Sequence, residues 1–191
     1  MKLIASFLIG YVFGNFQSSY IFVKLLKKRD IREIGSGNAG TMNTFLNVGE
    51  TIGILVLFCD MLKTIIPAII CTIFFGEIDV GEIISICSLG VFLGHCFPFW
   101  LGFKGGKGVA VAVAFALTLD IRNFLTAVIV AGIFGILIKS ATYGSYTFAI
   151  MLFVCAVDFG YGKWVVLSAF IQSLAIVLLH IRGKSRLVAT K

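Results

Sequence analysis

Residues 51–75 read TIGILVLFCDMLKTIIPAIICTIFF, and only Asp60 and Lys63 in this run carry charge. About 20 consecutive apolar residues form a helix that crosses the roughly 30 Å hydrocarbon core of a bilayer. Similar apolar runs follow one another along the 191 residues, of which 59% are hydrophobic and 13% charged. A soluble domain has roughly a quarter of its residues charged. The chain is therefore predicted to be an integral membrane protein.

Working outward from this run, hydropathy predicts about seven transmembrane helices in a single domain covering residues 1–191. The first apolar segment is too long for a signal peptide and is followed by no polar mature domain, so we take it as a span. The predicted fold class is an all-α membrane protein. The predicted spans are residues 3–23, 51–75, 84–101, 107–119, 123–138, 142–157 and 163–180.

The loops carry their positive charge very unevenly. If the N-terminus lies outside, 13 of the 16 Lys and Arg residues fall on the inner side, and only Lys2, Arg122 and Lys163 fall outside. Cytoplasmic loops of membrane proteins carry the excess of Lys and Arg. We therefore expect a multi-pass membrane protein with the N-terminus outside and the C-terminus in the cytosol.

Two inner loops are rich in glycine. Residues 35–43 read GSGNAGTMN, and residues 103–108 read FKGGKG. Glycine allows backbone conformations that turn N–H groups toward one point, and such concavities bind anions. Lys104 and Lys107 add point charges, although the spacing is not that of a nucleotide-binding P-loop. The alternatives are a flexible turn for the first loop and an ordinary positively charged inner loop for the second.

Three further features have both a functional and a structural interpretation. His95 precedes the second loop, and a lone histidine near a membrane interface is more often structural than catalytic. Asp60 and Lys63 lie on one face of a span, where charged residues usually pair with each other or face a polar cavity. The tail from His180 to Arg186 adds cations, which could equally be a membrane anchor. The five cysteines form no CxxC pair and are interpreted as small core residues.

These segments, taken in order, resemble one family. GSGNAGTMN, GHCFPFWLGFKGGKGVA (residues 94–110), the Asp60–Lys63 pair and the Arg186-Leu187 ending are similar to the bacterial acyl-phosphate:glycerol-3-phosphate acyltransferases, the PlsY family. KSATYGSYTFA around Ser145 is a weaker match. The resemblance covers essentially the whole chain and implies a place in the bacterial inner membrane, with the active face toward the cytosol. It implies transfer of a fatty acyl group from acyl phosphate to the 1-hydroxyl of glycerol 3-phosphate, which yields lysophosphatidic acid and phosphate for phospholipid synthesis.

The resemblance also implies roles for individual residues. The implied catalytic residues are Ser36, His95, Lys104 and His180. The implied substrate- and phosphate-binding residues are Gly35, Gly37, Asn38, Gly40, Asn43, Lys63, Gly105, Gly106, Lys107, Gly108, Ser145, Arg182 and Arg186. We expect no metal, no organic cofactor and no nucleic acid. The expected partners are acyl phosphate, glycerol 3-phosphate and membrane lipids. The expected oligomeric state is a monomer.

The chain departs from the family pattern at functional positions. Leu46 stands where the family places an arginine, and Gly183 stands where it places an asparagine. An arginine bound to phosphate contributes about 1.5–3 kcal/mol per charge-assisted bond. The alternatives are therefore a divergent but active acyltransferase and a weakened paralogue that binds acyl phosphate or a phospholipid as a sensor. A transporter of organic phosphate is less compatible, because the sequence has no internal repeat.

Overall fold

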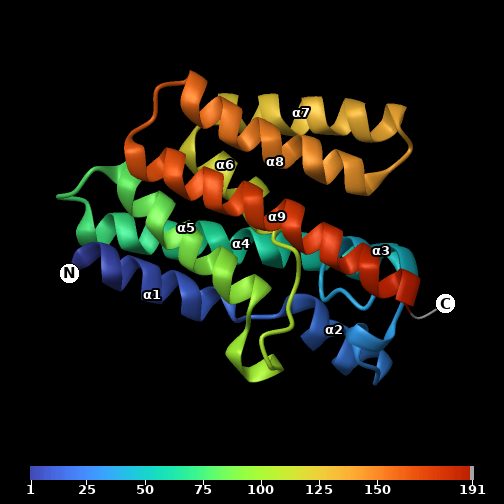
Figure 1. The fold of residues 1–191 in the computed structure, drawn as a ribbon. Coiled ribbons are helices and arrows are strands. Elements are labelled where there is room, and N and C mark those ends of the chain that lie inside the picture. The colour runs from blue at the N-terminus through green and yellow to red at the C-terminus, as the bar shows by residue number, and fades with distance from the viewer. Residues whose placement is uncertain (190–191) are drawn as a thin grey trace.

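The computed structural model describes residues 1–189, with side chains described as far as residue 183. Every regular element in that part of the chain is a helix, as predicted (Figure 1). The elements in chain order are α1 (Lys2–Gly14), α2 (Ser18–Lys27), the short 3-10 helix η1 (Ile31–Glu33), α3 (Thr41–Asn47), α4 (Glu50–Phe75), α5 (Val80–Cys96), the 3-10 helix η2 (Phe99–Leu101), α6 (Val109–Leu119), α7 (Ile121–Leu137), α8 (Ala141–Asp158) and α9 (Lys163–Ala189).

The segment predicted as one span at residues 3–23 is broken between α1 and α2. The break lies at polar residues whose side chains bind other parts of the chain. The Gln17 side-chain amide donates to the carbonyl oxygen of His95 at 3.2 Å, and Asn15 Oδ1 accepts from the Phe99 N–H at 3.0 Å. The expectation of a single helix was wrong here because these tertiary hydrogen bonds hold the break in place.

Helices α1 and α5 lie side by side, run in the same direction and approach closely. Gly10 packs against the carbonyl oxygen of Cys87, and four residues further along both helices Gly14 packs against that of Val91. A Cβ atom at Gly10 would stand 2.0 Å from the Cys87 oxygen. Small residues spaced in this way allow close backbone contact between membrane helices. The contact holds the C-terminal end of α5 next to the break.

The main core lies where α5, α6, α8 and α9 meet. Its large buried side chains include Phe92, Phe115, Leu152 and Ile176. Many large apolar side chains remain exposed around it, as for a protein whose solvent is lipid. Within the described part of the chain, four helical segments are long and apolar enough to cross a membrane, namely Glu50–Phe75, Val80–Leu101, Ala141–Asp158 and Lys163–Gly183. Val109–Leu119 and Ile121–Leu137 are shorter apolar helices.

The two ends of the bundle differ in character. The N-terminus lies at one end, and α2, α3 and the last turns of α9 lie at the other (Figure 1). Lys2 forms an ion pair with Glu77 at the N-terminal end. The glycine-rich loops lie at the end where α9 finishes.

Candidate functional site

The first glycine-rich loop is organised by Asn43. Its Oδ1 accepts from the Ser36 N–H at 3.0 Å, and its Nδ2 donates to the carbonyl oxygens of Ile34 at 2.9 Å and Asn38 at 3.0 Å. The side chain is 4% exposed. Since both ends of the amide bind the loop itself, the contacts of Asn43 are those of a residue that shapes the loop.

The second glycine-rich loop folds back on the end of α5. The Gly105 N–H donates to the carbonyl oxygen of Cys96 at 3.1 Å, and the Gly106 N–H donates to that of His95 at 3.0 Å. Gly106 lies between the two loops: a Cβ atom there would be 2.1 Å from His95 Nε2 and 3.0 Å from the Ala39 carbonyl oxygen. A residue larger than glycine would fit this junction only if the His95 ring or one of the loops moved.

Several glycine amides are already used inside the protein. In the first loop the Gly37 N–H donates to the Ile34 carbonyl oxygen at 3.0 Å, and its φ of 69° lies in the left-handed region, as predicted. With Gly105 and Gly106 also bonded to carbonyl groups, these three amides are not free to bind an anion. The expectation of glycine N–H groups turned toward a ligand was wrong for them, because short loops satisfy their own backbone groups.

The two loops and α9 border an open cavity of about 940 Å³, called here the loop cavity. It is lined by Asp30, Arg32, Glu33, Gly35, Ser36, Gly37, Asn38, Cys96, Phe97, Gly102, Phe103, Lys104, Gly105, Gly106, Lys107, Leu179, Arg182 and Gly183. Four cations thus face two carboxylates, and Asp30 already pairs with Arg32 at 2.7 Å. The excess of positive charge favours an anionic ligand.

Lys104 and Lys107 both line the loop cavity but differ in exposure. Lys104 is exposed, whereas Lys107 is half-buried, and burial lowers the pKa of the Lys107 ammonium below its usual value. Within residues 1–183 neither side chain has a hydrogen-bond or ion-pair partner. A half-buried ammonium without a carboxylate is stabilised when an anion binds it, because the anion supplies the missing partner.

Arg32 connects the first loop with the segment after α5. It binds Asp30, donates to the Leu101 carbonyl oxygen at 3.2 Å, and lies over the Tyr20 ring at 5.2 Å from its centre. The hydrogen bond from Arg32 holds the pKa of the Asp30 carboxyl below its usual value. Arg32 was not among the predicted site residues, and the Asp-x-Arg pattern that opens η1 is the local signal that could have indicated it.

The lining contains nine of the predicted site residues. They are Gly35, Ser36, Gly37, Asn38, Lys104, Gly105, Gly106, Lys107 and Arg182. The predicted residues outside it are Gly40, Asn43, Lys63, His95, Gly108, Ser145 and His180. Gly40 and Gly108 lie immediately before α3 and α6, so that α6 begins two residues after the predicted start of its span at residue 107. The Arg186 side chain lies outside the described residues.

Lys63 belongs to a buried polar cluster behind the second loop. Its Nζ lies 2.9 Å from Asp60 Oδ1, which confirms the expected ion pair, and 2.8 Å from His95 Nδ1. It also donates to the Phe16 carbonyl oxygen at 2.7 Å, and Ser18 donates to Asp60 at 2.7 Å. The cluster therefore joins α4, α5 and the break after α1.

His180 and Ser145 also have partners inside the protein. His180 Nδ1 lies 2.8 Å from the Ile176 carbonyl oxygen, and its ring meets the Tyr146 ring edge-on at 5.7 Å between centres. The Ser145 hydroxyl donates to the Ala141 carbonyl oxygen at 2.9 Å. Within residues 1–183 no group of three or more His, Cys, Asp or Glu side chains is placed to hold a metal ion.

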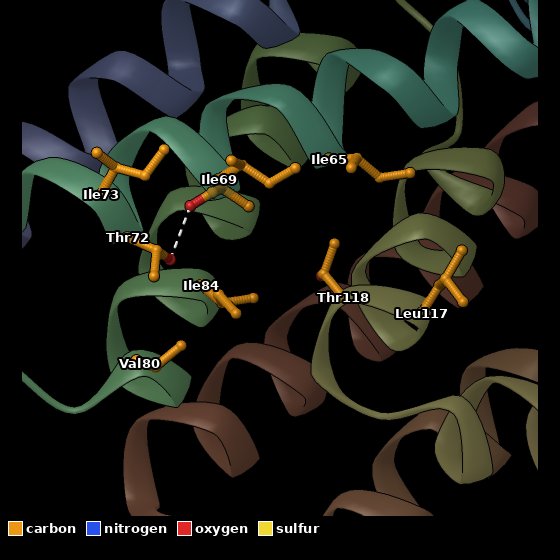
Figure 2. Close-up of a pocket in the computed structure, with 9 residues that line it drawn as sticks. Ile65, Ile69, Thr72, Ile73, Val80, Ile84, Leu117 and Thr118 are labelled. Carbon is orange, nitrogen blue, oxygen red and sulfur yellow. Dashed lines mark hydrogen bonds between the residues drawn. The ribbon is translucent and has the colours of Figure 1, made fainter. Parts of the chain in front are cut away.

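A second cavity of about 400 Å³ lies between α4, α5 and α6 and is called here the apolar pocket (Figure 2). It is lined by Ile65, Ala68, Ile69, Thr72, Ile73, Val80, Ile84, Leu117 and Thr118. The Thr72 hydroxyl donates to the Ala68 carbonyl oxygen at 2.9 Å, as the dashed line shows. Because no charged side chain lines it, the apolar pocket has none of the features of a phosphate site.

Comparison with known proteins agrees with these features. A family model described as glycerol-3-phosphate acyltransferase matches residues 4–190. The glycerol-3-phosphate acyltransferase of Shouchella clausii is 35% identical over 99% of this chain and 94% of its own length. Glycerol-3-phosphate acyltransferase 1 of Lactobacillus acidophilus is 39% identical over 81% of this chain and 74% of its own length.

The fold is also that of a solved membrane enzyme. The crystal structure of PlsY, an integral membrane glycerol 3-phosphate acyltransferase, in its glycerol 3-phosphate form matches with a TM-score of 0.87 and 30% identity. The match covers 100% of this chain and 94% of the PlsY chain. The lysophosphatidic acid form of PlsY matches with a TM-score of 0.82. This chain is therefore a membrane protein that belongs to the glycerol-3-phosphate acyltransferase (PlsY) family.

Proposed function

We propose that this protein transfers a fatty acyl group from acyl phosphate to the 1-hydroxyl of glycerol 3-phosphate. The observation that supports this most strongly is the convergence of Lys104, Lys107 and Arg182 on the loop cavity. These residues come from two segments far apart in the sequence. Both substrates and the released phosphate carry phosphate groups, which several cations can hold together in one cavity.

The reaction needs positioning more than a nucleophilic side chain. The glycerol hydroxyl oxygen attacks the acyl carbonyl carbon, the C–O bond to phosphate breaks, and inorganic phosphate leaves. We propose that a phosphate oxygen of the substrate takes the hydroxyl proton. Bringing two bound reactants into contact lowers the barrier, and Lys104 and Lys107 would stabilise negative charge on the leaving group.

We also propose seven membrane spans, with the N-terminus outside and the loop cavity on the cytosolic side of the bacterial inner membrane. Under this proposal the chain first crosses through α1 and the break, and then through α4, α5, α6, α7, α8 and α9. The asymmetry of Lys and Arg supports this orientation. Reporter fusions at the C-terminus and in the loop after Phe75 would test it, and a periplasmic signal from the C-terminal fusion would contradict it.

The direct test of the reaction uses the purified full-length protein with acyl phosphate and glycerol 3-phosphate. We expect equal amounts of lysophosphatidic acid and inorganic phosphate to appear. Acyl coenzyme A and acyl carrier protein offered in parallel would identify the donor. Lys104→Met should lower the rate, while Lys139→Met, an exposed lysine outside the loop cavity, serves as the matched control. No product with any donor from folded protein would contradict the proposal.

The second candidate is binding of the same ligands without turnover, and the observation that favours it is that Gly183 places no side chain beside Lys107. Leu46, the other position that departs from the family pattern, is 69% exposed and lies outside the loop cavity. Binding of glycerol 3-phosphate without product formation would support this candidate. A Leu46→Arg variant shows whether the missing guanidinium limits the rate. Because Leu46 is outside the lining, we expect no gain in turnover from it.

A further inference from the structure

The hydrogen bonds of Lys63 determine which nitrogen of His95 carries the proton. The Lys63 ammonium has three protons and three close neighbours, namely the Phe16 carbonyl oxygen, Asp60 Oδ1 and His95 Nδ1, at 2.7, 2.9 and 2.8 Å. A carbonyl and a carboxylate oxygen can only accept. The third proton therefore points at His95 Nδ1, which must be the acceptor.

The other edge of the His95 ring faces the junction of the two loops. With Nδ1 accepting, the ring proton lies on Nε2, which is the nitrogen next to Gly106. A proton on Nδ1 as well would set an N–H against the Lys63 ammonium, two donors in contact. Since His95 is 3% exposed and is not among the residues that line the loop cavity, its ring supports Gly106 from behind.

We propose that Lys63, held by Asp60, locks His95 as the Nε2–H tautomer, which makes His95 a positioning residue for the loop of Gly105–Lys107 and not the base of acyl transfer. The statement about the base rests on the proposed function, whereas the tautomer does not. A general base needs a free lone pair directed at the substrate proton. The lone pair of His95 is directed at Lys63 instead.

His180 has the opposite arrangement and provides an internal control. Its Nδ1 lies 2.8 Å from the Ile176 carbonyl oxygen, which can only accept, so Nδ1 carries the proton. The protein contains only these two histidines. The two imidazoles of one chain are thus expected to hold opposite tautomers, which a single labelled sample can distinguish.

The first test is nitrogen NMR of the full-length protein labelled with ¹⁵N-histidine in lipid nanodiscs. We expect one histidine with an unprotonated Nδ1 and one with a protonated Nδ1, and His180→Gln should remove the second set of signals. In Lys63→Met the His95 signals should shift toward a mixture of tautomers. A protonated Nδ1 on His95 in the wild type would overturn the proposal, whether or not the protein proves to be an acyltransferase.

The second test compares rates and pH profiles of His95→Gln with wild type. Glutamine can place an N–H near the position of Nε2 but provides no base. We expect the variant to keep the shape of the pH–rate profile and to lose more in KM for glycerol 3-phosphate than in kcat. Removing a general base typically costs about 10²–10⁴ in rate. A loss of that size, with the acidic limb of the profile abolished, would overturn the positioning role.

Discussion

Lys63 and Lys107 both carry ammonium groups that are at least partly buried, but they differ in whether those groups have partners inside the protein. The Lys63 side chain is 4% exposed, and its protons are used by a carboxylate, a carbonyl group and an imidazole. Lys107 is half-buried and has no hydrogen-bond or ion-pair partner within residues 1–183. Buried charge therefore serves two purposes in this protein. Lys63 joins parts of the fold, whereas Lys107 lacks a partner that an anionic ligand can supply.

The largest effect is expected from Lys63→Met, which tests whether Lys63 has a structural role. The substitution leaves the Asp60 carboxylate buried without its cation, which typically costs about 3–5 kcal/mol. We expect a large drop in the unfolding temperature in detergent, together with a loss of acyltransferase rate. An Asp60→Asn/Lys63→Met double variant should recover part of the stability, because it removes the unpaired charge. A single variant as stable as wild type would mean that the cluster is not structural.

Lys107→Met should weaken substrate binding and leave the stability of the protein unchanged. A lost charge-assisted bond to phosphate corresponds to about 1.5–3 kcal/mol, or roughly 10–100-fold in affinity. We expect KM for the phosphorylated substrates to rise by that factor without a loss of thermal stability, since no partner of Lys107 within residues 1–183 is removed. Lys139→Met provides the matched control. Unfolding at a much lower temperature than wild type would place Lys107 in the same class as Lys63.

The pH dependence of phosphate binding tests the role of the Lys107 ammonium. Because burial lowers the pKa of Lys107, the group loses its proton at a lower pH than an ordinary lysine. The unfolded chain keeps that proton up to the ordinary pKa, so between the two pKa values the stability of the ligand-free protein rises with pH. Phosphate affinity should fall over the same interval, as the ammonium disappears.

A Lys107→Arg variant is the control for this effect, because a guanidinium stays charged throughout the range. We expect its phosphate affinity, measured by calorimetry, to decline less at alkaline pH than that of wild type. Identical alkaline declines in the two proteins would show that Lys107 is not the titrating group.

The smallest expected effect comes from Gly183→Ala. A Cβ atom there would lie 3.0 Å from Lys107 Nζ and 3.2 Å from its Cε, so the ammonium must shift by a few tenths of an ångström. The flexible end of a lysine moves easily, and we expect a change in KM below about fivefold, equivalent to roughly 1 kcal/mol. Gly132→Ala, where a Cβ would meet nothing within 4 Å, is the control. A change as large as that of Lys107→Met would show that Gly183 itself determines ligand affinity.

Much of the site could be predicted from short motifs. Lys104, Lys107 and the first glycine-rich loop were expected on the same inner side of the membrane, and they line one cavity. The roles of Asn15 and Gln17 could not be predicted, because a polar residue within an apolar run does not indicate which distant carbonyl group it will bind. The same holds for the glycine amides, whose partners depend on how each loop closes.

The helical membrane class and the family could be predicted from the sequence alone, because hydropathy is a local property and the loop motifs are contiguous. The contacts between helices were needed to show that Lys63 meets His95 and that Lys107 has no hydrogen-bond or ion-pair partner within residues 1–183. A lysine within a motif looks the same in both cases. Whether its charge is neutralised depends on groups from other helices, since electrostatic interactions act over a few ångströms in space regardless of distance along the chain.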